Sequence, residues 1–129
     1  MLRKKEEHKE QVAFVNYLYL LEKQGKIITF FAVPNGGSRN IREARNLKLE
    51  GVRAGVSDLV VVLKDKVVFI EMKQPPKKLK SGKLSTAGIS VQDSQKRFLE
   101  KVTESDVCVG YIAYGFAQAR VIINDNIED

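Results

Sequence analysis

Residues 55–73 read GVSDLVVVLKDKVVFIEMK, and the predicted fold is built around this segment. Two apolar runs, Leu59–Leu63 and Val67–Ile70, flank a charged tripeptide, a pattern that predicts a β-hairpin. Neither run alternates apolar with polar residues, so both strands should lie inside a sheet that is covered on both faces. Asp58 precedes the first strand and Glu71–Lys73 ends the second. A hairpin therefore brings these polar residues to one edge of the sheet.

The register of this hairpin determines whether its polar residues share a face. Glu71 and Lys73 are two positions apart, so they point to the same side of a strand. If residues 64 and 65 form the loop, Asp58 lies directly opposite Glu71, and Cβ atoms in such pairs are about 4.5–5.5 Å apart. Two carboxylates that close repel each other unless they share a cation, and oxygen-rich clusters suit Mg²⁺ or Mn²⁺. Lys73 would then orient an attacking water or stabilise negative charge on a phosphate.

Residue spacing alone also allows a simpler interpretation of the same residues. Acidic and basic side chains at strand ends commonly form a solvated rim with an incidental ion pair, here between Glu71 and Lys73. Aspartate followed later by Glu-x-Lys is a loose pattern by itself. The placement of Asp58 and of Glu-x-Lys at the mouths of two neighbouring buried strands favours a functional cluster.

The N-terminal segment, from about Glu6 to Lys23, has the periodicity of a helix. Its apolar stripe has spacings of three and four and contains Phe14, Val15, Leu18 and Leu21. Followed backwards, that stripe passes through Gln11 and Glu7. From periodicity alone, these first turns are expected to project into solvent.

The remaining elements follow from similar patterns. Strands are expected at residues 27–33 and 107–113, and helices at 41–50, 90–104 and 116–123. The last of these helices would also suit a strand, and a capping box at Ser90–Asp93 should open the one before it. Residues 124–129 form a polar, acidic tail. The order of elements indicates one α/β domain over residues 1–129, with a core at about 7–123 and a mixed central β-sheet flanked by helices.

Basic side chains surround the predicted hairpin. The net charge is 22 − 16 = +6, and a balance this basic in a small domain favours a polyanionic partner. A row of cations follows the helix at 41–50, and a basic segment at 77–83 lies in a connection longer than usual loops. Solvated helix faces and disordered surface loops give the same patterns. The candidate phosphate-contacting residues are Arg39, Arg42, Arg45, Arg53, Lys77, Lys78 and Lys80.

Four short motifs together resemble the VRR-NUC domain, which denotes the virus-type replication-repair nucleases of the PD-(D/E)XK, or restriction-endonuclease-like, superfamily. The motifs are Asn35-Gly36-Gly37, Gly51–Asp58, Phe69–Lys73 and Ser94–Phe98, and the resemblance extends from about Glu7 to Ile123. Each motif is loose alone, whereas their combination is specific. Ser57 stands where that superfamily often has proline, at a position that varies among such nucleases.

The resemblance implies a restriction-endonuclease-like core and metal-dependent cleavage of DNA phosphodiester bonds. The residues that it assigns to the catalytic site are Asp58, Glu71, Lys73, Glu7 and Gln95. The ligands that it implies for Mg²⁺ or Mn²⁺ are Asp58, Glu71, the backbone carbonyl of Met72, and Glu7. Its other motif positions are Gln11, Asn35 and Gly36. Lys73 would be the catalytic lysine. Branched or junction DNA in replication and repair is one candidate substrate, but the sequence does not identify the preferred DNA structure.

The same resemblance implies DNA and a second copy of the chain as partners, since proteins of this size in the family commonly form homodimers. A non-catalytic DNA-binding module that retains the fold is the alternative, and a broken Asp–Glu–Lys set would favour it. The basic charge alone does not distinguish RNA from DNA. Glycine-rich phosphate-binding motifs are absent from the sequence, so no organic cofactor is expected. Long apolar runs and a secretory leader are absent too, which predicts an intracellular protein that does not enter a membrane.

Overall fold

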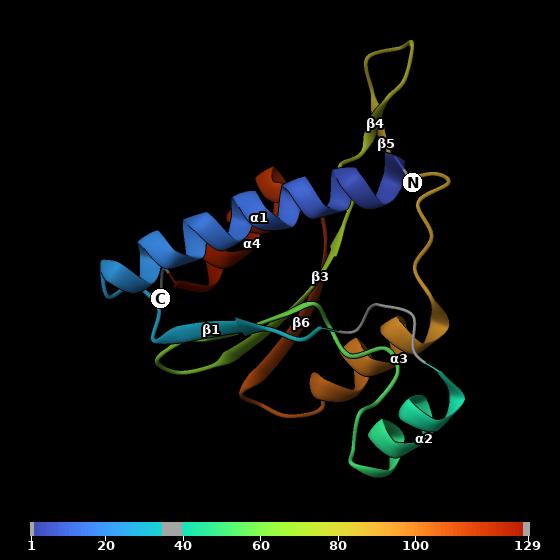
Figure 1. Cartoon of the computed structure of the whole chain (residues 1–129). Helices are drawn as coiled ribbons and strands as arrows, with labels where there is room; N and C mark the ends of the chain where they lie inside the picture. The colour runs from blue at the N-terminus through green and yellow to red at the C-terminus, as the bar shows by residue number, and fades with distance from the viewer. Residues whose placement is uncertain (1, 35–39, 128–129) are drawn as a thin grey trace.

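The domain is built on a four-stranded mixed sheet with the strand order β1-β2-β3-β6 (Figure 1). The computed structural model describes residues 2–34 and 40–127. The strands of this sheet are β1 (Thr29–Ala32), β2 (Leu59–Val62), β3 (Val67–Lys73) and β6 (Cys108–Tyr114). The helices are α1 (Leu2–Lys23), α2 (Ile41–Leu49), α3 (Asp93–Val102) and α4 (Phe116–Ile127). The first three strands pair antiparallel and β6 pairs parallel with β3, which confirms the predicted mixed sheet and α/β class.

The β2–β3 hairpin has the register that a two-residue loop predicts. The Leu63 amide donates a hydrogen bond to the Lys66 carbonyl at 2.8 Å, so residues 64–65 form the loop. Antiparallel pairing from that loop onward places Asp58 directly opposite Glu71, one position beyond the last paired residue of β2. The two strands are also the interior strands of the sheet, as their unbroken apolar runs predicted.

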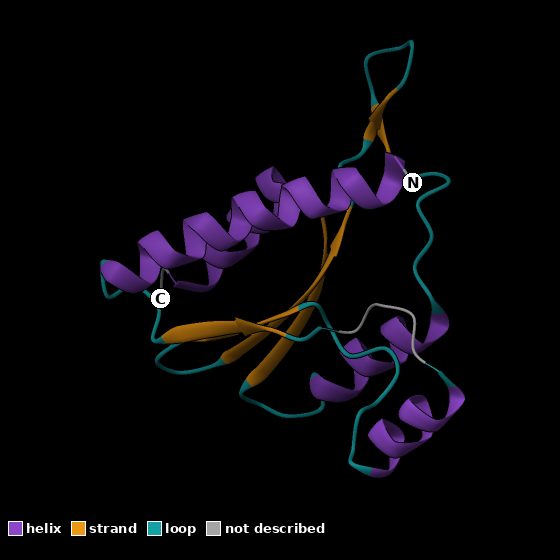
Figure 2. Ribbon diagram, viewed as in Figure 1, coloured by secondary structure: helices purple, strands orange, loops and turns teal. Residues whose placement is uncertain are grey.

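The helices α1 and α4 lie together across one face of the sheet (Figure 2). Phe14 and Leu18 of α1 and Ile123 of α4 are fully buried there. They belong to the same apolar cluster as Val61 of β2 and Ile70 of β3. This side of the sheet forms the main hydrophobic core.

The helix α3 packs on the opposite face. The rings of Phe69 in β3 and Phe98 in α3 meet edge to face, with centroids 5.6 Å apart. Gly110 of β6 permits this approach, because a Cβ there would lie 2.9 Å from the Leu99 side chain. Glu71 is two residues from Phe69, and alternate residues of a strand share a face. The α3 side is therefore where the polar end of β3 is presented.

The C-terminal helix is longer than its sequence suggests. It continues to Ile127, so the polar tail expected at residues 124–129 is wrong for residues 124–127. Asn126 is only 8% exposed, and its side-chain amide donates to the Tyr111 hydroxyl at 3.1 Å and to the Ile122 carbonyl at 2.8 Å. A polar side chain whose hydrogen bonds are satisfied is compatible with burial, which polarity alone does not reveal.

The segment between β3 and α3 also differs from expectation. Residues 77–85, expected as a loop, contain a small hairpin of β4 (Lys77–Lys78) and β5 (Leu84–Ser85). The helix α3 begins at Asp93 with Gln92 as its N-cap, so the predicted start at Ser90 is wrong. The reason is that Gln95 caps the Gln92 amide at 3.0 Å. None of the helices in the described ranges is long and apolar enough to cross a membrane.

Candidate active site

The candidate site lies where β3 runs beyond the end of β2. Pairing between these strands stops at Leu59 and Ile70, whereas β6 follows β3 as far as Lys73. The amide of Met72 is therefore beyond the reach of the β2 ladder. The Asp58 Oδ2 atom accepts a hydrogen bond from this amide at 2.8 Å. This bond fixes the carboxylate of Asp58 beside the polar end of β3.

The loop that carries Asp58 is held against the start of α3. Gly55 has a φ of 84°, in the left-handed region that favours glycine. A Cβ at this position would also collide with the backbone carbonyl of Ser94. Ser57 is fully buried and donates its hydroxyl to the Leu59 carbonyl at 3.2 Å. The Gly55–Asp58 motif therefore has a structural cause, which is close contact between this loop and α3.

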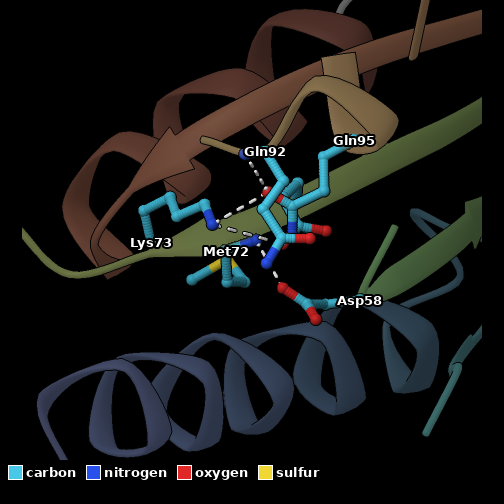
Figure 3. Close-up of polar contacts among 6 residues, drawn as sticks. Asp58, Met72, Lys73, Gln92 and Gln95 are labelled. Atoms are coloured by element: carbon cyan, nitrogen blue, oxygen red, sulfur yellow. Dashed lines mark hydrogen bonds and ion pairs between the residues drawn. The ribbon is translucent and has the colours of Figure 1, made fainter. Parts of the chain in front are cut away.

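Gln95 joins the lysine to the carboxylate of the site (Figure 3). Its Nε2 atom donates to Glu71 Oε2 at 2.8 Å, and its Oε1 atom accepts from Lys73 Nζ at 3.0 Å. The same Oε1 atom accepts the Gln92 amide, so the first turn of α3 fixes the side chain. Lys73 Nζ lies 3.8 Å from Glu71 Oε2. The expected contact of Gln95 with the end of β3 is therefore present.

The carboxylates of the site are held in an environment that disfavours their charge. Glu71 is 4% exposed and Lys73 is 8% exposed. Burial, and then the neighbouring charge of Asp58, raise the pKa of Glu71 to about 8 although Lys73 opposes the shift. Burial also raises the pKa of Asp58, against the opposing effects of the Met72 amide and of Lys73. Without a further cation, the pair is thus prevented from carrying its full negative charge at neutral pH.

One oxygen of the pair has no donor within the described structure. Glu71 Oε1 is buried and accepts no hydrogen bond there. Such an atom normally costs free energy unless a hydrogen bond or a cation compensates for its lost hydration. Hard divalent cations prefer carboxylate oxygens of this kind. Asp58 and Glu71 therefore have the donor chemistry that Mg²⁺ or Mn²⁺ requires.

The structure does not bring every predicted ligand into this group. Within residues 2–34 and 40–127, no three or more His, Cys, Asp or Glu side chains are arranged to hold a metal ion. Glu7 and Gln11 are half-buried on α1, and Glu7 does not complete a three-carboxylate cluster with Asp58 and Glu71. Met72 contacts Asp58 through its amide. Ligand roles for Glu7 and for the Met72 carbonyl stay predictions.

A groove of about 1410 Å³ runs between α2 and α3 to the carboxylates. Its lining includes Asp58 and Glu71 together with the cations Arg53, Arg97 and Lys101. The two α3 cations were not among the predicted phosphate-contacting residues, although their spacing of four on a helix places them on one side and was a usable signal. The groove connects a basic surface with the candidate site.

The other predicted phosphate-contacting residues are spread over exposed surfaces. Arg42 and Arg45 are exposed on α2, a helix that contains no buried residue. The predicted contacts Lys77, Lys78 and Lys80 are exposed on the β4–β5 hairpin. Three predicted positions, Asn35, Gly36 and Arg39, lie outside the described residues. Basic side chains are therefore exposed on two separate elements, α2 and the β4–β5 hairpin.

Comparisons with known proteins agree with this architecture. A family model described as the VRR-NUC domain matches residues 1–115. A solved structure described as a "VRR_NUC domain protein" superposes with a TM-score of 0.64 over 93% of this chain and 86% of that chain, at 19% sequence identity. At that identity, the likeness shows a shared fold. A search of curated proteins finds no match.

Proposed function

The chain belongs to the VRR-NUC domain family, a nuclease-type family, and from that premise we propose that it is a Mg²⁺- or Mn²⁺-dependent deoxyribonuclease. The observation that carries the proposal is the carboxylate pair of Glu71, which is buried, and Asp58, which is half-buried, with Lys73 fixed beside Glu71. A purely structural ion pair would not need a second carboxylate directly opposite the first. An ion shared by both carboxylates accounts for their proximity.

The side chains have distinct roles in the proposed reaction. Asp58 and Glu71 hold the ion, which when bound supplies Lewis-acid polarisation of the phosphate and a lower pKa for an attacking water. Lys73 presents its ammonium group to the phosphate oxygens or to that water. Gln95 fixes Lys73 and Glu71 through its two polar atoms, so it positions both groups before the substrate arrives.

The non-catalytic alternative accounts less well for the burial of the site. A module that only binds DNA needs exposed cations and gains nothing from a buried Glu71 beside a second carboxylate. The preference for branched or junction DNA, and a homodimer that places two sites on two strands, remain parts of the proposal. Sedimentation at several protein concentrations measures the second of these directly.

Cleavage assays with and without metal test the proposed activity. Labelled duplex, nicked, flap and four-way DNA should be cut in Mg²⁺ or Mn²⁺ and stay intact in EDTA. Asp58→Asn should lose cleavage because it loses a metal ligand, while DNA binding in EDTA persists. The exposed Asp106 provides a matched control, and Asp106→Asn should cut like wild type. If wild type cuts none of the four DNAs in either metal, the nuclease proposal is wrong.

The exposed arginines of α2 give a separate, electrostatic prediction. Each phosphate that a protein neutralises contributes about −0.9 to the slope of log K against log salt. Arg42→Ala and Arg45→Ala should therefore each reduce the magnitude of the slope by about one unit. Binding is measured in EDTA over a salt series, with Lys23→Ala at the far end of α1 as control (Figure 1). Unchanged slopes in both arginine variants would mean that this helix face is simply solvated.

A further inference from the structure

The β4–β5 hairpin projects from the body of the domain directly after β3 (Figure 1). Lys77 pairs with Ser85 and Lys78 with Leu84, and the Leu79 amide donates to the Lys83 carbonyl at 2.8 Å. Among the described elements, the two strands make their main contacts with each other. Two-stranded hairpins are marginally stable by themselves in water. A binding partner would therefore stabilise this one.

The charge of the hairpin identifies the chemistry of that partner. Residues 74–92 contain no aspartate and no glutamate. The lysines of the hairpin are all exposed and are Lys77, Lys78, Lys80 and Lys83. Four cations without an acidic neighbour in the segment match a polyanion. Nucleic acid is the partner that the charge favours.

Two exposed leucines make the hairpin more than a basic surface. Leu79 is 49% exposed and Leu84 is 69% exposed. Leu84 shares a face with Lys78, its cross-strand partner, so Leu79 at the next position points to the other face. Each face of the hairpin thus presents one apolar side chain among lysines. Both faces would fit a partner whose apolar surface is flanked by negative charges. DNA has this arrangement, because its bases lie between two phosphate backbones.

We propose that the hairpin enters a groove of the DNA substrate edge on, with one face toward each wall of the groove, where its lysines contact phosphates while Leu79 and Leu84 contact the bases and partly unstack a base step. The inference rests on the proposed function for its choice of DNA. It adds that the hairpin selects DNA whose bases unstack easily. Only three residues separate Lys73 from β4, so the disturbed step lies close to the phosphate that is cut. β-Ribbons enter DNA grooves, and apolar wedges unstack base steps in other proteins. DNA that is already unstacked at this step binds more tightly.

Tryptophan fluorescence tests the contact with bases. The chain has no tryptophan, so Leu79→Trp and Leu84→Trp each introduce a single reporter. Val121→Trp on α4, where Val121 is 57% exposed, is the matched control. In EDTA, duplex DNA should quench both hairpin reporters and leave the α4 reporter unchanged. If duplex DNA binds without quenching either hairpin reporter, the proposal is wrong.

DNA that carries 2-aminopurine tests the unstacking. Wild type should raise the 2-aminopurine fluorescence at one step and bind a duplex with a two-nucleotide bubble there about tenfold more tightly than the intact duplex. Leu79→Ser with Leu84→Ser should lose both effects and keep the salt slope, whereas Lys77→Gln with Lys83→Gln should reduce that slope by about two units. If the double leucine variant keeps the 2-aminopurine signal and the preference for bubble DNA, the leucines do not unstack the base step. The proposal is also wrong if the only effect of the two substitutions is to convert a dimer to a monomer in sedimentation.

These measurements need no metal, so the wedge and the nuclease activity fail separately. A protein that cuts DNA but shows unquenched hairpin tryptophans contradicts the wedge alone. A protein with quenched tryptophans that cuts nothing in Mg²⁺ or Mn²⁺ contradicts the nuclease alone. Thermal unfolding of each variant verifies the fold, which the exposed leucines are not needed to support.

Discussion

Replacing Lys73 with alanine should lower the rate of DNA cleavage by about 10²–10³-fold, the usual effect of losing a positioned electrostatic or proton-transfer group. The substitution leaves both carboxylates of the pair in place. It removes the ammonium group that lies 3.0 Å from Gln95 Oε1 and 3.8 Å from Glu71 Oε2. DNA affinity in EDTA should stay close to that of wild type, because Lys73 is one of 22 lysine and arginine residues in the chain. Single-turnover cleavage and equilibrium binding measure the two quantities separately.

The control for this prediction is Lys96→Ala, because Lys96 is exposed and follows Gln95 directly on α3. It removes the same charge from the same region and should cut DNA at the wild-type rate. Lys73 is more enclosed than a solvated strand end would be, so its loss should also destabilise the protein to a small extent. Thermal unfolding monitors that effect. If Lys73→Ala cuts as fast as Lys96→Ala, the ion pair with Glu71 is only an incidental feature of the sheet edge.

The parts of the fold that sequence predicted are those with local causes. The β2–β3 register depends on a two-residue loop and on the pleat, both of which lie within 16 residues from Asp58 to Lys73. Long-range contacts had no such local signal. Glu10 of α1 accepts the amide of Phe116 at 2.7 Å and so caps α4 from 106 residues away. Periodicity marks Glu10 only as a polar residue on a helix and does not identify this partner.

In the candidate site, too, contacts between distant segments could not be predicted from local sequence patterns. Asp58, Glu71 and Lys73 could be placed together from strand geometry. Helix periodicity placed Gln95 near the sheet edge, whereas its catalytic role was implied only by the resemblance to a family. A helical stripe gives the direction of Glu7 relative to its own helix axis. It does not give the position of that helix along the sheet, which packing against α4 and the sheet determines. The grouping of Glu7 with the carboxylates was therefore beyond what periodicity can predict.

The carboxylate pair gives the second large effect, in which loss of activity accompanies a gain of stability. Glu71→Gln removes a proposed metal ligand, so cleavage should fall by at least about 10²-fold. In the folded protein the pKa of Glu71 is about 8, above its ordinary value of 4.5. The stability that comes from a neutral Glu71 is therefore complete below about pH 4.5 and is lost as the pH rises through about 8. Metal-free wild type should become less stable over this range, whereas the glutamine stays neutral.

Urea unfolding in EDTA at several pH values between about 5 and 9 measures this difference. At the alkaline end, Glu71→Gln should be more stable than wild type by roughly 1–3 kcal/mol, the cost of a buried polar group that lacks a partner. The exposed Glu100 provides the control, and Glu100→Gln should follow the wild-type profile. Mg²⁺ should restore the stability of wild type at alkaline pH, because it binds the deprotonated carboxylates, and should have little effect on Glu71→Gln. Parallel pH profiles for wild type and Glu71→Gln would mean that the pair is already neutralised by another group, which removes the reason for assigning a shared metal ion.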